Sequence, residues 1–114
     1  MTDLVTSTPL DPRIAKIAAA IRLEIPDCEV RLFGSHARGT ARADSDADLL
    51  ITVPDAWLAC HDRLQVLGEL WRKLARHHLP LDLLLYSRSE VRERAQYRSA
   101  VTTQAYQEGI LLNG

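Results

Sequence analysis

Three aspartates in the chain have spacings that could bind metal ions. Asp46 and Asp48 stand two residues apart at the start of an apolar run, Ala47 to Val53, that favours a β-strand. Alternate residues of a strand face the same side, so both carboxylates should lie on one face of a sheet. Two like charges this close repel each other and raise one pKa unless a cation lies between them. The spacing therefore predicts a site for a hard divalent ion such as Mg²⁺.

The third aspartate and a glycine–serine pair extend this prediction. Asp82 lies in another apolar run, Leu81 to Leu85, where a lone charge is costly to bury without a partner. If that strand lies beside the first, three carboxylates can hold two metal ions about 4 Å apart, as used for displacement at phosphorus. Gly34 lets the backbone approach a phosphate, while Ser35 and a helix N-terminus offer N–H donors and a positive dipole end.

Two other interpretations of this segment are available. A phosphate loop of the G-x-x-x-x-G-K-[ST] type is excluded, because Thr40 stands where the lysine is required. Alternatively, Gly34 is a simple turn, Ser35 a simple N-cap, and the aspartates are solvated loop charges. Each residue taken alone fits that second interpretation, but their combination favours a metal and phosphate site.

Other polar side chains lie near these residues in the sequence. Arg38 lies three residues after Ser35 on the same helix face, so it could bind a phosphate or an active-site aspartate. The alternative for Arg38 is a surface or structural ion pair. We expect Asp44 to be a turn residue, and we do not expect His36 to reach the substrate.

Periodicity and capping signals predict the elements that position these residues. The first helix has Asp11 as N-cap and ends at Pro26, and the last helix covers residues 98–112. Between them the sequence predicts a strand at Cys28–Phe33, a short helix at His36–Ala41 capped by Ser35, a strand at Ala47–Val53, a long helix from Asp55 to about His77, a strand at Leu81–Tyr86, and a helix after the capping-box spacing Ser87–Glu90.

The chemistry predicts how the strands pair. Gly34 ends the first strand and must meet Asp46 at the start of the second, so these strands should be antiparallel. Asp82, near the start of the third strand, must reach the same end, so the second and third strands should be parallel. The sheet is therefore expected to be mixed, with the long helix crossing over between its parallel strands.

Composition limits the class of protein. The chain has 114 residues, 46% of them hydrophobic, and a net charge of −1, which argues against disorder and against dedicated binding of duplex DNA. No apolar stretch is long enough to span a membrane, and residues 1–10 do not resemble a secretion signal. Cys28 and Cys60 are expected to be buried thiols in a reducing cytoplasm. We expect residues 1–10 to be a flexible lead-in and residues 11–114 to form a single α/β (α+β) domain.

The pattern Gly34-Ser35, ten residues, Asp46, one residue, Asp48 resembles the signature of the DNA polymerase β-like nucleotidyltransferases. It is especially similar to the minimal nucleotidyltransferases, the small antitoxin partners of HEPN-domain toxins. The resemblance implies a nucleotidyltransferase fold with a mixed sheet of three or more strands flanked by helices. It also implies that Gly34 and Ser35 hold the triphosphate, that Asp46 and Asp48 hold Mg²⁺, and that Asp82 is the third carboxylate.

The resemblance covers roughly residues 14–90 and implies transfer of a nucleoside monophosphate to a hydroxyl. The leading hypothesis is an Mg²⁺-dependent protein adenylyltransferase that transfers AMP from ATP to a tyrosine of a cognate HEPN toxin and so acts as its antitoxin. The chain is too short to carry its own acceptor domain, which favours a separate protein as acceptor. The alternatives are an antitoxin that neutralises its toxin by binding alone, and an enzyme that modifies a small molecule such as an aminoglycoside.

Overall fold

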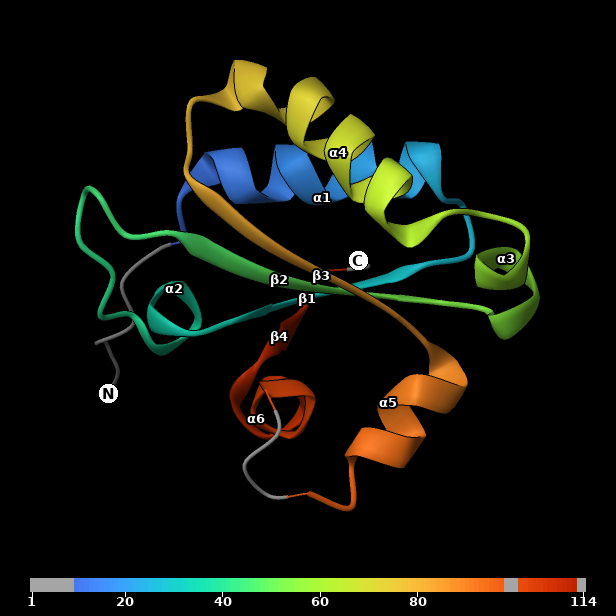
Figure 1. Ribbon diagram of the computed structural model, residues 1–114. Helices are drawn as coiled ribbons and strands as arrows, with labels where there is room; N and C mark the ends of the chain where they lie inside the picture. The colour runs from blue at the N-terminus through green and yellow to red at the C-terminus, as the bar shows by residue number, and fades with distance from the viewer. Residues whose placement is uncertain (1–9, 98–100, 113–114) are drawn as a thin grey trace.

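The computed structural model describes residues 10–97 and 101–112. Helices and strands alternate through most of this part of the chain (Figure 1). In chain order they are α1 (Pro12–Glu24), β1 (Glu29–Phe33), α2 (Ser35–Arg38), β2 (Ala47–Val53), α3 (Asp55–Ala59), α4 (Arg63–Leu74), the 3₁₀ turn η1 (Ala75–His77), β3 (Leu81–Ser87), α5 (Arg88–Arg94), α6 (Val101–Glu108) and β4 (Ile110–Leu111).

The sheet is mixed and has the strand order β3-β2-β1-β4. β1 pairs with β2 in the antiparallel sense and β2 with β3 in the parallel sense, which confirms the predicted pairing. The fourth strand, β4, pairs with β1 antiparallel and was not predicted. The sequence predicts a helix over 98–112 that includes these residues, but the observed helix ends at Glu108, and residues 98–100, 113 and 114 lie outside the described part.

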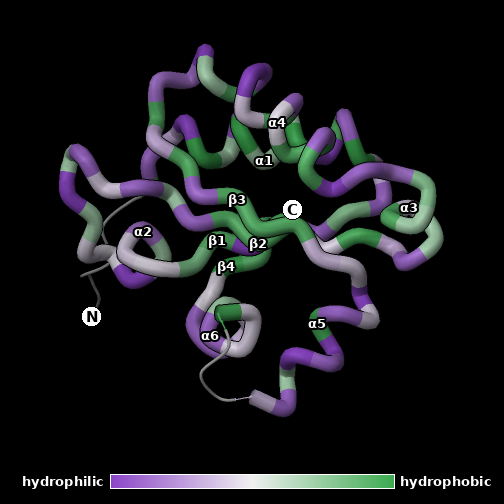
Figure 2. The backbone as a smooth tube through the Cα atoms, viewed as in Figure 1, coloured by the Kyte–Doolittle hydropathy of each residue, from purple (hydrophilic) through white to green (hydrophobic). Residues whose placement is uncertain are grey.

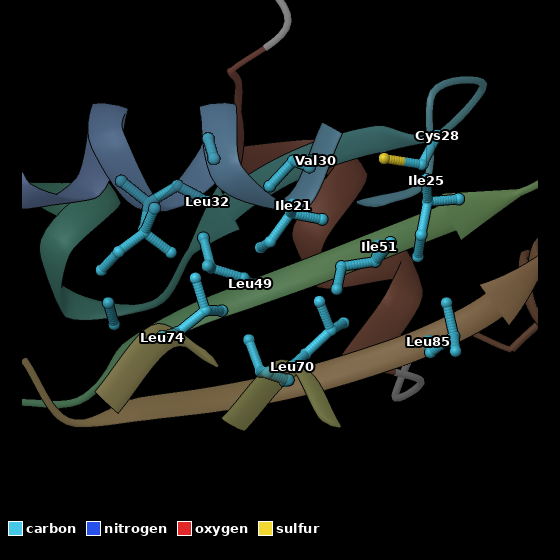
Figure 3. Packing of buried hydrophobic residues seen from close by; sticks show 14 of the residues in the cluster. Ile21, Ile25, Cys28, Val30, Leu32, Leu49, Ile51, Leu70, Leu74 and Leu85 are labelled. Carbon is cyan, nitrogen blue, oxygen red and sulfur yellow. The ribbon is translucent and has the colours of Figure 1, made fainter. Parts of the chain in front are cut away.

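Two layers of helices cover the sheet. α1 and α4 lie over one face, and α5 and α6 lie on the other (Figure 1). The main core lies under α1 and α4, where Ile21 and Leu70 point toward Ile51 of the sheet (Figure 3). Hydrophobic residues concentrate in the central strands, whereas α5 is largely hydrophilic (Figure 2). None of the helices in the described ranges is long and apolar enough to cross a membrane.

Capping residues explain where several helices begin. Asp11 accepts a hydrogen bond from the Arg13 backbone N–H at 2.9 Å and caps α1, as predicted. Ser87 and Glu90 form the predicted reciprocal capping box of α5. These short-range signals depend only on neighbouring residues, so the sequence reveals them directly.

The long helix predicted from Asp55 to His77 is wrong, because two helices replace it. α3 ends at Ala59, and Asp62 then accepts hydrogen bonds from the backbone N–H groups of Leu64 and Gln65 to start α4. Asp55 does not cap α3. Its carboxylate instead accepts from the backbone N–H of Ser89 at 3.0 Å, tying α3 to α5.

Two further sequence expectations are corrected. The short helix is Ser35–Arg38 rather than His36–Ala41, since Gly39 adopts a left-handed conformation that ends it. Cys28 is buried, and burial raises the pKa of its thiol to about 11. Cys60 is exposed rather than buried.

Candidate active site

The parallel pairing of β2 and β3 sets Asp48 directly beside Asp82. The flanking residues Leu49 and Leu83 belong to the core under α1 and α4, so alternation along the strands directs the two aspartates to the opposite face. Asp48 is partly buried, while Asp82 is exposed to solvent. The expected burial cost of Asp82 therefore does not arise, and strand register alone brings it beside Asp48.

Asp46 precedes β2 and is also exposed. Together with Asp82, it adds negative charge around Asp48. Among the described residues, no three His, Cys, Asp or Glu side chains converge tightly enough to form a ready-made metal cage. The arrangement is an adjacent pair of carboxylates with a third, solvent-exposed carboxylate close in sequence.

Electrostatics reflect this crowding of carboxylates. Burial raises the pKa of Asp48 above its ordinary value, and the charges of Asp82 and Asp46 raise it further. The nearby side chains of His36 and Arg38 act in the opposite direction and lower it. Ionised Asp48 is thus less stable here than in water, and a bound cation would favour its charged form.

Gly34 packs against Asp48 at the point where β1 passes into α2. Its φ of 74° and ψ of −155° lie in a region that L side chains rarely adopt. A Cβ atom at this position would collide with Oδ2 of Asp48. The register of β1 on β2, which pairs Phe33 with Asp48, produces this close approach. Glycine is therefore required both for the backbone turn and for the space beside the carboxylate.

Ser35 is the first residue of α2, and Gly34 rather than Ser35 occupies the N-cap position. The expectation that the Ser35 side chain caps the helix is therefore wrong. The Ser35 carbonyl accepts from the Thr40 backbone N–H at 2.9 Å, which closes the end of the short helix. Ser35 still lies at the start of the helix, one residue beyond the turn against Asp48.

The loop between α2 and β2 is held by hydrogen bonds of Ser45. The ring Nε2 of His36 lies 3.2 Å from the Ser45 carbonyl oxygen, and the Ser45 hydroxyl accepts from the Arg42 backbone N–H at 2.7 Å. These bonds connect the glycine–serine turn to the segment that carries Asp46. His36 thus has a structural contact with the loop.

Arg38 forms an ion pair with Glu108 of α6, with 2.9 Å between Nη1 and Oε1. This is the alternative that the sequence left open, and a contact of Arg38 with nucleotide stays a prediction. Sequence reasoning did not identify Glu108. The two residues are seventy positions apart, and no local pattern marks a glutamate at the end of a C-terminal helix.

Beyond the carboxylates, the same side of the sheet opens into a groove between α5 and α6. The groove has a volume of about 310 Å³, and its apolar wall includes Val91, Ala95 and Tyr106. Residues of the second, smaller core cluster, Phe33 and Leu50, lie on this side of the sheet. The carboxylate face is thus accessible at its end and only partly covered along its length.

Comparisons with known proteins identify the family of the sequence and similar folds. The sequence model of the nucleotidyltransferase domain family matches residues 13–108. A crystal structure of a toxin–antitoxin with AMP-PNP superposes with a TM-score of 0.59 and 29% identity, covering 90% of this chain and 71% of that chain. A proposed nucleotidyltransferase from Sulfolobus solfataricus superposes with a TM-score of 0.51 and 20% identity, covering 87% of this chain and 75% of that one. No curated protein sequence matches the chain significantly.

Proposed function

Because the chain belongs to the nucleotidyltransferase domain family, we propose that it transfers AMP from ATP to a hydroxyl group of a partner protein. The observation that carries this proposal is the placement of Gly34 against Asp48, with Asp82 beside Asp48 on the next strand. A glycine turn in contact with paired carboxylates can bring a nucleotide's phosphates and their metal ions together.

The donor set fits Mg²⁺. The three aspartates offer carboxylate oxygens, two of them are exposed to solvent, and the raised pKa of Asp48 reflects burial and unneutralised like charge. In the proposal, Asp46, Asp48 and Asp82 hold two Mg²⁺ ions. When bound, such ions neutralise phosphate charge and polarise the phosphorus that is attacked.

The chain's own groups then have distinct tasks. The turn at Gly34 lets a phosphate approach the backbone, the backbone N–H groups from Ser35 onward bind the triphosphate, and Arg38 contributes positive charge beside it. Asp82 accepts the proton of the acceptor hydroxyl as the hydroxyl oxygen forms its bond to the α-phosphorus. The bond from that phosphorus to the pyrophosphate oxygen breaks, and pyrophosphate leaves.

For the acceptor we propose a tyrosine of a cognate HEPN-domain toxin, which would make this chain its antitoxin. The similar structure solved with AMP-PNP is a toxin–antitoxin, which supports a partner of that kind. The exposure of Asp46 and Asp82 also leaves room for a side chain of another protein to reach the site.

The experiment is label transfer from [α-³²P]ATP, with Mg²⁺, to the HEPN-domain protein encoded beside this chain. The double variant Asp46→Asn/Asp48→Asn should reduce transfer by a factor of about 10³ or more, because it removes the charge that binds the metal ions. Asp44→Asn is the matched control, since Asp44 is an exposed aspartate in the same loop. It should retain wild-type transfer.

Two results would contradict the proposal. Absence of label on the toxin with the wild-type chain would exclude transfer to it, and equal labelling by the double variant would exclude these carboxylates. Toxin neutralisation that survives in the double variant would instead indicate an antitoxin that acts by binding alone. Label transfer to an aminoglycoside in a parallel reaction would indicate a small-molecule acceptor.

A further inference from the structure

The C-terminal segment, α6 with β4, is fixed against the end of β1 that leads into Gly34. β4 pairs Ile110 with Leu32, and the Leu112 backbone N–H donates to the Val30 carbonyl at 2.8 Å. Gly109 joins the two elements so closely that a Cβ there would lie 2.9 Å from the Leu32 carbonyl oxygen. This segment is therefore a fixed part of the fold beside the glycine–serine turn.

Glu108, the last residue of α6, reaches both ends of α2 from this fixed position. Its carboxylate accepts hydrogen bonds from Arg38 Nη1 at 2.9 Å and from Gln104 Nε2 at 2.8 Å. The Gln104 amide lowers the pKa of Glu108 most, and the Arg38 guanidinium and the Gly34 backbone N–H lower it further. Glu108 is thus held as a carboxylate between Gly34, the N-cap of α2, and Arg38, the last residue of that helix.

The short helix α2 needs such a contact. It has four residues, none of them fully buried, and it packs on the main core through the partly buried Ala37, so polar contacts are needed to complete the fixing of its orientation. His36 ties it to the loop before β2, and Glu108 ties it to α6. Arg38 also lowers the pKa of Asp48, so the guanidinium bound to Glu108 is close enough to act on that carboxylate as well.

We infer that Glu108 is a positioning residue, which holds Arg38 and the Gly34 turn in the orientation that receives the triphosphate of ATP. The inference rests on the proposed function. Two alternative roles of Glu108 predict different effects on ATP binding. A merely structural ion pair would affect thermal stability alone, and a carboxylate that competes with phosphate would weaken ATP binding in the wild-type chain.

The test is Glu108→Gln, which keeps the size of the side chain but removes its charge. We expect the KM for Mg²⁺–ATP in the label-transfer assay, and the Kd measured by calorimetry without acceptor, to rise about tenfold. The kcat per folded molecule should stay within about twofold, because Glu108 does not touch the reacting atoms. Glu93→Gln is the matched control on the exposed surface of α5 and should leave both constants unchanged.

An unchanged KM and Kd in Glu108→Gln, with or without a lower melting temperature, would overturn the inference. A decrease in either constant would also overturn it, because it would show that Glu108 competes with phosphate. If this variant does not fold, Glu108→Asp decides: a raised KM supports the inference, and an unchanged KM rejects it. Failure of the wild-type chain to bind ATP or transfer label would instead reject the proposed function.

Discussion

The two faces of β2 differ in what they do. Residues on the side of α1 and α4, such as Leu49 and Ile51, are completely buried and pack with both helices. On the other side, the strand begins with the partly buried Asp48, whose pKa is raised by burial and by its carboxylate neighbours. The first face stabilises the fold along its length, whereas the second adds a smaller core around Leu50 and carries, at its start, a charge that opposes folding but suits a metal ion. Alternation along a single strand separates the two roles.

A cavity in the face of β2 that α1 and α4 cover should have the largest effect on stability. Leu49→Ala should lower the free energy of unfolding by about 3 kcal/mol, because it removes buried methyl groups and leaves a cavity. Urea denaturation followed by circular dichroism measures this. The transfer rate per folded molecule should stay near that of the wild type, since the side chain of Leu49 points away from the carboxylates.

Leu64→Ala is the control for Leu49→Ala. Leu64 on α4 is 79% exposed, so its substitution should change the free energy of unfolding by less than about 0.5 kcal/mol. If Leu49→Ala abolished transfer while most of the protein remained folded, stability and chemistry would not be divided between the two faces.

Gly34 lies on the border between the faces, and its substitution should have an intermediate effect. Gly34→Ala forces a side chain into a positive-φ conformation and into contact with Oδ2 of Asp48. We expect a loss of about 2 kcal/mol in stability together with weaker ATP binding, since the turn must shift away from the carboxylate. Thermal denaturation and calorimetric titration with Mg²⁺–ATP measure the two effects.

Gly68→Ala provides a matched control inside α4. Apart from its chain neighbours and the nearby backbone of its own helix, no atom lies within 4 Å of the Cβ it would add, and alanine favours the helix, so this variant should gain up to about 1 kcal/mol. Equal effects of the two substitutions would show that the contact of Gly34 with Asp48 has no special importance.

Local patterns predicted the part of this arrangement that depends on neighbouring residues. The alternation in Ala47–Val53 and Leu81–Leu85, with the need to gather three carboxylates, correctly predicted an antiparallel and a parallel strand pair. The sequence did not predict that a new helix, α4, begins after its N-cap Asp62. The apolar period continues across the gap between α3 and α4, so one long helix was predicted instead.

The contribution of the C-terminal segment could not be predicted from local patterns. Ile110 and Leu111 form a two-residue strand whose pairing with β1 depends on a partner far away in the chain. The contact of Arg38 with Glu108 likewise exists only once α6 has packed beside β1. Both are tertiary contacts between distant segments, which periodicity and capping do not encode.

The smallest expected effect on stability concerns the charge of Asp48 and depends on pH. Because the pKa of Asp48 is raised in the folded state, folding favours its protonated form. Stability from this group is therefore complete below the unfolded pKa of about 4 and is lost as the pH rises through the folded value. Asp48→Asn removes this penalty, and solvent screening limits the gain at neutral pH to about 1 kcal/mol or less.

Melting curves of Asp48→Asn and the wild type between about pH 3 and pH 8 test this dependence. The variant should melt higher at neutral pH, and the difference should disappear at low pH, where Asp48 of the wild type is protonated. Saturating Mg²⁺ should reduce the difference by stabilising only the wild type. A variant that melts lower than the wild type at neutral pH without Mg²⁺ would contradict this prediction. It would mean that ionised Asp48 stabilises the fold.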